Sequence, residues 1–111
     1  MKTSVEKVEG KRLIKVEGRL DTLTAPQLET VIFQVISEDQ YHIILDLTGT
    51  DYISSTGFRV FILAQKKTKP HGGQIVLMGV NDEIKEIFDI SGFTQLFSFS
   101  STLEESLSFF S

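Results

Sequence analysis

The chain reads Asp46-Leu47-Thr48-Gly49-Thr50-Asp51-Tyr52-Ile53-Ser54-Ser55-Thr56-Gly57-Phe58 where an apolar run passes into a helical pattern. Residues 42–47 are nearly continuous in apolar side chains, which is typical of a central, parallel strand covered on both faces. Residues 55–69 repeat apolar side chains at helical spacing, and Pro70 is expected to end that helix. Three hydroxyls begin it, where the helix dipole and unpaired N–H groups favour an added anion. The stretch is therefore a candidate site of serine phosphorylation, which adds a charge of about −1.5 to −2.

On the N-terminal side of this stretch, the patterns predict a hairpin and a helix. Residues 4–9 and 11–18 form two short runs, and the second alternates between apolar and polar positions, which favours an antiparallel hairpin. A helix is expected to follow, with Thr24 as N-cap, Pro26 in the first turn and Gln27 completing a capping box. Its apolar residues recur at helical spacing, and it should end near Glu38.

On the C-terminal side, the sequence predicts two further strand and helix pairs. Residues 74–78 are a short apolar strand, and Asn81 is placed to cap a helix that stops at Gly92. Residues 96–99 are predicted as an edge strand. Ser101 and Glu104 make a capping box for a last helix. We expect the phenylalanines in this region to complete the core, with an exposed apolar contact patch as the alternative; they are Phe97, Phe99, Phe109 and Phe110.

The predicted order is ββαβαβαβα, which is typical of an α/β fold with a mixed, mostly parallel β-sheet and about four α-helices packed on it. At 111 residues, the chain is long enough for one core and is expected to be a single domain spanning residues 1–111. In such sheets, functional residues gather in the loops at the carboxyl ends of strands. The turn from Asp51 to Gly57 is expected at such an end.

Composition argues against several classes of function. The net charge is −4 and the basic residues are scattered, so nucleic acid is not an expected partner. There is no cysteine, and no run approaches the roughly 18 to 20 apolar residues of a membrane helix, so we expect a cytoplasmic domain without membrane insertion. His42 and His71 lack the spacing of a metal site or general base, and no phosphate-binding glycine motif is present. We expect no cofactor, no metal and no enzymatic activity.

The hydroxyls at the predicted helix start have two interpretations. Ser54, Ser55 and Thr56 are all favoured as N-caps for structural reasons alone. Gly57 costs a helix roughly 1 kcal/mol relative to alanine, which indicates that close backbone approach or freedom is needed there. Asp21 is favoured as a turn aspartate by local hydrogen bonding.

Four segments, taken in order, resemble the STAS-domain proteins of the bacterial anti-sigma-factor antagonist family. The resemblance covers almost the whole chain. Its segments are Val16-Glu17-Gly18-Arg19-Leu20-Asp21 with Thr24-Ala25, Ile44-Leu45-Asp46-Leu47, Tyr52-Ile53-Ser54-Ser55-Thr56-Gly57-Phe58 and Phe88-Asp89-Ile90-Ser91-Gly92-Phe93. The resemblance implies the STAS fold.

The resemblance also implies a partner-switching function. In this family, an anti-sigma factor with serine kinase activity phosphorylates a serine whose position matches Ser55, and a serine phosphatase removes the phosphate. The unphosphorylated antagonist binds the kinase and frees a sigma factor. The resemblance implies a partner surface formed or framed by Asp21, Asp51, Ser54, Ser55, Thr56, Gly57 and Phe58. The protein itself is expected to be a monomer or weak dimer.

The chain departs from the family motif at one position, because Ser54 stands where the family usually has aspartate before the phosphoacceptor. Ser54 is therefore an alternative acceptor. A second interpretation is a STAS binding or scaffold module that is not phosphorylated and that associates with a transporter or signalling complex.

Overall fold

The computed structural model describes residues 1–110 and contains strands and helices in the predicted order ββαβαβαβα. The strands are β1 (Lys2–Val8), β2 (Lys11–Glu17), β3 (His42–Gly49), β4 (Gln74–Met78) and β5 (Ser98–Ser100). The helices are α1 (Ala25–Ser37), α2 (Ser55–Thr68), α3 (Asp82–Ser91) and α4 (Leu103–Ser108). Short 3₁₀ segments, Lys69–His71 and Phe93–Leu96, follow α2 and α3.

The strands form one mixed sheet in the spatial order β1-β2-β3-β4-β5. β1 and β2 pair antiparallel as the predicted hairpin, with Val5 opposite Ile14. The pairs β2–β3, β3–β4 and β4–β5 are all parallel. Parallel neighbours need a crossover connection, and α1, α2 and α3 supply the three crossovers. The predicted α/β class with a mostly parallel sheet is confirmed, and the carboxyl ends of β2, β3 and β4 share one edge of the sheet.

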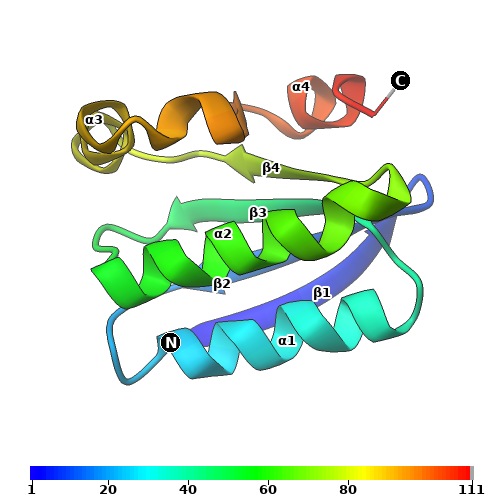
Figure 1. Ribbon diagram of the computed structural model, residues 1–111, viewed down its shortest axis with the longest axis horizontal. Coiled ribbons are helices and arrows are strands. Elements are labelled where there is room, and N and C mark those ends of the chain that lie inside the picture. Colours follow the sequence, from blue (N-terminus) through cyan, green and yellow to red (C-terminus); the bar gives the residue numbers. More distant parts are fainter. Residues whose placement is uncertain (111) are drawn as a thin grey trace.

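The larger core lies between the sheet and the two helices α1 and α2, which Figure 1 shows side by side along one face. Ile43, Leu45 and Leu47 of β3 point into this core and are fully buried. Ile44 points to the opposite face, where Leu103 of α4 packs against its cluster. Because side chains alternate along a strand, this pattern covers β3 on both faces, as its continuous apolar run predicts.

Phenylalanines join α3 to the larger core. The Phe88 ring is fully buried, and its centroid lies 4.6 Å from that of Phe58 and 5.7 Å from that of Phe97. Phe99 also packs against this core, and Phe110 packs against the smaller cluster beneath α4. Phe109 alone of the four predicted core phenylalanines is classed among the exposed side chains, at 40%. The expectation of a core role is therefore wrong for Phe109.

Two predicted caps differ from the structure. Thr24 is the N-cap residue of α1, as predicted, but its side chain makes no capping hydrogen bond. Its hydroxyl instead donates to the Arg19 carbonyl, so the capping box with Gln27 is wrong. The cap of α4 is Thr102 rather than Ser101, and its hydroxyl accepts from the Glu105 N–H. Residues 101–105 contain two overlapping Ser/Thr-x-x-Glu patterns, and the end of β5 at Ser100 decides between them.

Two predicted element ends also shift. The predicted edge strand over 96–99 is found as Ser98–Ser100, because residues up to Leu96 form a 3₁₀ turn after Gly92. Gly92 has a φ of 77°, the left-handed conformation that ends helices and favours glycine. α2 ends at Thr68, and Pro70 lies inside the following 3₁₀ segment.

Candidate functional site

The loop from β3 to α2 is held against the end of β2 by a buried threonine. The Thr50 hydroxyl donates to the Val16 carbonyl at 3.1 Å, and the Thr50 N–H donates to the Leu47 carbonyl. Thr50 is 2% exposed, so this polar group is buried with its hydrogen bonds satisfied. The contact fixes where the loop leaves the sheet.

A short parallel bridge brings the second predicted segment to the same place. The Leu20 N–H donates to the Tyr52 carbonyl at 2.9 Å, and the Ser54 N–H donates to the Leu20 carbonyl at 2.8 Å. The loop after β2, which carries Asp21, thereby lies beside the loop that carries Asp51 and Ser54. The structure therefore brings together the residues of the predicted partner surface.

The first turn of α2 separates the roles of its two serines. The Ser54 hydroxyl is the N-cap and accepts from the Gly57 N–H at 3.2 Å, while the Ser54 carbonyl accepts from the Phe58 N–H. Ser55 is the first residue of α2, its side chain is exposed, and its hydroxyl makes no hydrogen bond with residues 1–110. The cap therefore engages one hydroxyl and leaves the next available to solvent. Thr56, which follows, is half-buried.

Gly57 lies where α2 approaches the loop after β2 most closely. A Cβ atom there would lie 2.9 Å from Leu20 Cγ and 3.0 Å from Ile53 Cγ2. Leu20 is fully buried and Ile53 is 5% exposed, so neither side chain has room to retreat. The close backbone approach that the sequence indicates is thus a contact with the two residues of the bridge.

Replacing Gly57 with alanine is therefore expected to destabilise the protein, although alanine is the better helix former. We expect a net loss of about 1–3 kcal/mol in the free energy of unfolding, because overpacking outweighs the propensity gain. Urea denaturation measures it, with Thr56→Ala as the control in the same turn. A more stable Gly57→Ala variant would contradict the tight packing described above.

Phe58 lies beneath the surface of the site. It is 9% exposed, and its ring packs on Phe88 rather than projecting from the surface. Of the predicted surface residues, Gly57 and Phe58 are therefore buried, whereas Asp51 and Ser55 are exposed. Asp51 makes no side-chain hydrogen bond or salt bridge with residues 1–110.

Asp21 organises the loop before α1. Its carboxylate accepts from the N–H groups of Leu23 and Thr24, each at 3.0 Å, and lies 3.9 Å from the Arg19 Nε. The hydrogen bond from the Thr24 N–H is the main cause that holds the pKa of Asp21 below its ordinary value. The Arg19 guanidinium also lies over the Tyr52 ring, 4.1 Å from its centroid. Asp21 thus makes the local hydrogen bonds expected of a turn aspartate. Its place in a partner surface stays a prediction.

An apolar hollow of about 480 Å³ opens beside Ser55, between α2 and α3. Its apolar lining includes Phe58 and Ile62 from α2, Ile87 from α3 and Phe93. Ile87 is 46% exposed although it belongs to the apolar stripe of its helix. The residue pattern alone did not predict this hollow. The exposed isoleucine on a helical stripe is the signal that points to it, and it becomes visible only when α3 is placed next to α2.

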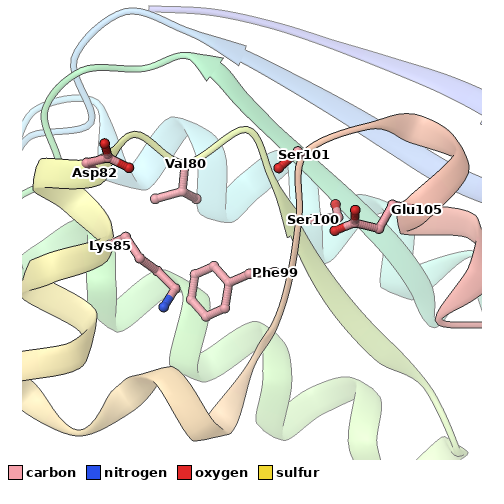
Figure 2. Close-up of a pocket in the computed structure, with 7 residues that line it drawn as sticks. All are labelled: Val80, Asp82, Lys85, Phe99, Ser100, Ser101 and Glu105. Carbon is pink, nitrogen blue, oxygen red and sulfur yellow. The ribbon is translucent and has the colours of Figure 1, made fainter.

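A smaller hollow of about 200 Å³ lies among residues from α3, β5 and α4 and is drawn in Figure 2. Its lysine, Lys85, has its Nζ 3.1 Å from Asp89 Oδ1 and 4.7 Å from the Phe99 ring centroid. The lysine is therefore already engaged by neighbours, and no residue of the predicted partner surface lines this hollow.

The histidines lie away from Ser55. His71 follows α2 at its far end and stacks on Tyr41 with ring centroids 4.0 Å apart, whereas Ser55 begins the helix. His42 starts β3 and packs edge-on against Phe110. Among residues 1–110, no group of three or more His, Cys, Asp or Glu side chains is arranged to hold a metal ion. Across the same residues, no helix has both the length and the apolar character of a membrane span.

Comparison with known proteins identifies the family. The family model described as STAS domain matches residues 2–106. The chain is 32% identical over 104 residues to BtrV of Bordetella bronchiseptica, and the aligned region covers 94% of this chain and 90% of that protein. It is 31% identical over 83 residues to the anti-sigma-B factor antagonist of Staphylococcus aureus, which covers 75% of this chain and 77% of that protein.

A solved structure shows the same fold. The Bacillus cell fate determinant SpoIIAA, in its phosphorylated form, superposes with a TM-score of 0.77 at 18% identity, covering 99% of this chain and all of that one. The resemblance identified from four sequence segments is thus confirmed by an independent match along nearly the whole chain. The chain belongs to the STAS-domain family of anti-sigma-factor antagonists.

Proposed function

We propose that this protein is an anti-sigma-factor antagonist that binds an anti-sigma factor with serine kinase activity and thereby releases a sigma factor. The binding surface comprises the two bridged loops and the first turn of α2, with Asp51 and Ser55 at exposed positions and the half-buried Asp21 beside them. The name of the Staphylococcus aureus relative, an antagonist of an anti-sigma-B factor, supports this class of partner. The activity is one of binding and needs no catalytic group of this chain.

Phosphorylation of Ser55 is the proposed off-switch. The Ser55 hydroxyl oxygen displaces ADP from the γ-phosphorus of kinase-bound ATP, and the hydroxyl proton passes to a base of the kinase. A serine phosphatase then hydrolyses the new O–P bond and releases inorganic phosphate. A dianion in a desolvated interface is costly unless basic groups meet it, so the phosphorylated form binds weakly.

One observation carries the choice of Ser55 over Ser54. The Ser54 hydroxyl is occupied as the cap of α2, whereas the Ser55 hydroxyl is exposed and without a partner among residues 1–110. A kinase that used Ser54 would have to break the cap, which costs about 1 kcal/mol. SpoIIAA, whose phosphorylated form has been solved, provides a precedent on the same fold.

A second function is favoured by Ser54 itself, which replaces the aspartate usual in the family motif. A STAS binding or scaffold module without phosphoryl transfer would use the same exposed loops and the apolar hollow beside them. Such a module is expected to associate with a transporter or signalling complex.

Mass spectrometry of the protein isolated from growing and stressed cells of its host distinguishes the two functions. We expect a phosphate on Ser55 whose occupancy changes with condition. Phosphate on Ser54 would keep the switch and move its site. An intact mass without phosphate under every condition would reject the switch and select the scaffold function.

A further inference from the structure

Arg59 lies one helical turn after Ser55 on α2. Residues four apart on a helix have Cβ atoms about 5–6 Å apart and share a face. Ser55 and Arg59 are both exposed, and both line the apolar hollow between α2 and α3. The two side chains therefore open into the same space, beside the first turn of the helix.

Within residues 1–110, no carboxylate forms a salt bridge with this arginine. The salt bridges among residues 1–110 are Lys15–Glu17, Arg19–Asp21 and Lys85–Asp89, and none includes Arg59. Other basic side chains of α2, Lys66 and Lys67, belong to its last turn. Arg59 is thus the cation nearest to Ser55 along this helix.

One acidic residue from another element lies near this arginine without forming a salt bridge to it. Glu29 of α1 is half-buried and lines a separate hollow of about 280 Å³ together with Arg59 and Thr56. Asp51 precedes the helix in the exposed loop. From α3, the residues that line the hollow beside Ser55 are the uncharged Ile87 and Ser91. A new anion at Ser55 would therefore face Arg59 without a carboxylate from α3 between them.

We propose that the Arg59 guanidinium forms an ion pair with the phosphate on Ser55, across one turn of α2. The inference rests on the proposed function, since it takes Ser55 as the acceptor. A guanidinium presents paired N–H donors that match phosphate oxygens, and charge-assisted bonds of this kind are about twice as strong as neutral ones. The positive end of the α2 dipole acts on the same anion in the same direction.

With this pairing, phosphorylation changes two side chains of the binding surface, Ser55 and Arg59. In the unphosphorylated protein, Arg59 lines the hollow and forms no salt bridge with residues 1–110. After phosphorylation, its charge is neutralised by a group of its own helix and its side chain is drawn toward residue 55. A partner then meets an added phosphate and also loses access to the arginine.

The second pKa of the phosphate tests this pairing without any kinase or partner. Phosphoserine is placed at residue 55 of the full chain during synthesis, and the phosphorus NMR shift is followed against pH. A nearby cation favours the dianion, so removing it must raise a pKa that is ordinarily about 6. We expect Arg59→Gln to raise it by about 0.3 units or more relative to the wild-type sequence.

Two variants serve as controls. Arg59→Lys keeps the charge and should retain part of the effect, while Lys66→Gln, in the last turn of α2, should leave the pKa unchanged. Equal pKa values for wild type and Arg59→Gln would overturn the pairing, as would equal rises in Arg59→Gln and Lys66→Gln. Because the phosphate is installed during synthesis, the NMR titration does not depend on whether the host phosphorylates Ser55. Mass spectrometry of the protein isolated from its host answers that separate question.

Discussion

Replacing Phe88 with alanine is expected to lower the free energy of unfolding by about 3–5 kcal/mol, the range for truncating a buried phenylalanine. Phe88 is fully buried and its ring packs against aromatic rings from α2 and from the segment around β5. These neighbours are Phe58, Phe61, Phe97 and Phe99. Domains of this size have a total stability of about 5–15 kcal/mol, so the loss is a large fraction of it. Urea denaturation and the melting temperature both measure it, with a fall on the order of 15 °C.

Ile90→Ala is the matched control for this prediction. Ile90 lies on the same helix, α3, but is 80% exposed, so its truncation should change stability by less than about 0.5 kcal/mol. Equal effects of the two substitutions would mean that α3 is not docked through Phe88. Because Phe58 forms the floor of the proposed binding surface, Phe88→Ala should also loosen the start of α2, which amide hydrogen exchange detects.

Replacing Ser55 with aspartate is expected to weaken binding to the anti-sigma factor about 100-fold, equivalent to about 2.8 kcal/mol. The physical reason is the cost of enclosing a carboxylate in an interface that is complementary to a neutral hydroxyl. The fold should survive, because an acidic side chain in the first turn of a helix is favourable for the dipole. Calorimetric titration with the anti-sigma factor recovered with the wild-type chain from its host measures the change.

Two further variants separate charge from position. Ser55→Ala removes the acceptor without adding charge, so it should bind nearly as tightly as wild type and carry no phosphate. Ser101→Asp adds the same charge at an exposed position before α4, outside the proposed surface, and should leave affinity unchanged. If Ser55→Asp bound as tightly as wild type, Ser55 would not lie in the interface.

Much of the fold could be predicted because its signals are local. The apolar run at residues 42–47, the helical spacing after Ser55 and the left-handed glycine at the end of α3 each act within a few residues. Their periods and end signals do not depend on the rest of the chain. The same holds for the Asp21 turn, whose hydrogen bonds reach only to Leu23 and Thr24.

The hydrogen bonding at two helix caps was predicted incorrectly because the local sequence allowed more than one arrangement. Residues 101–105 hold two equivalent capping patterns, and the one in use depends on where β5 ends against β4. The Thr24 hydroxyl donates to the carbonyl of Arg19 in the loop after β2 instead of capping α1. The choice of the α4 cap thus depended on strand pairing, and the role of the Thr24 hydroxyl depended on the path of that loop.

Residue patterns alone were sufficient for the element order, the central parallel strand and the hydroxyl-rich start of α2, since each is written in neighbouring positions. The surroundings of Ser55 required the packed molecule. Leu20 pairs with the loop before α2, and Ile87 and Phe93 shape the hollow beside it, although all three are distant in sequence. Such contacts form only when crossover helices bring the strand ends to one edge of the sheet, so no local pattern records them.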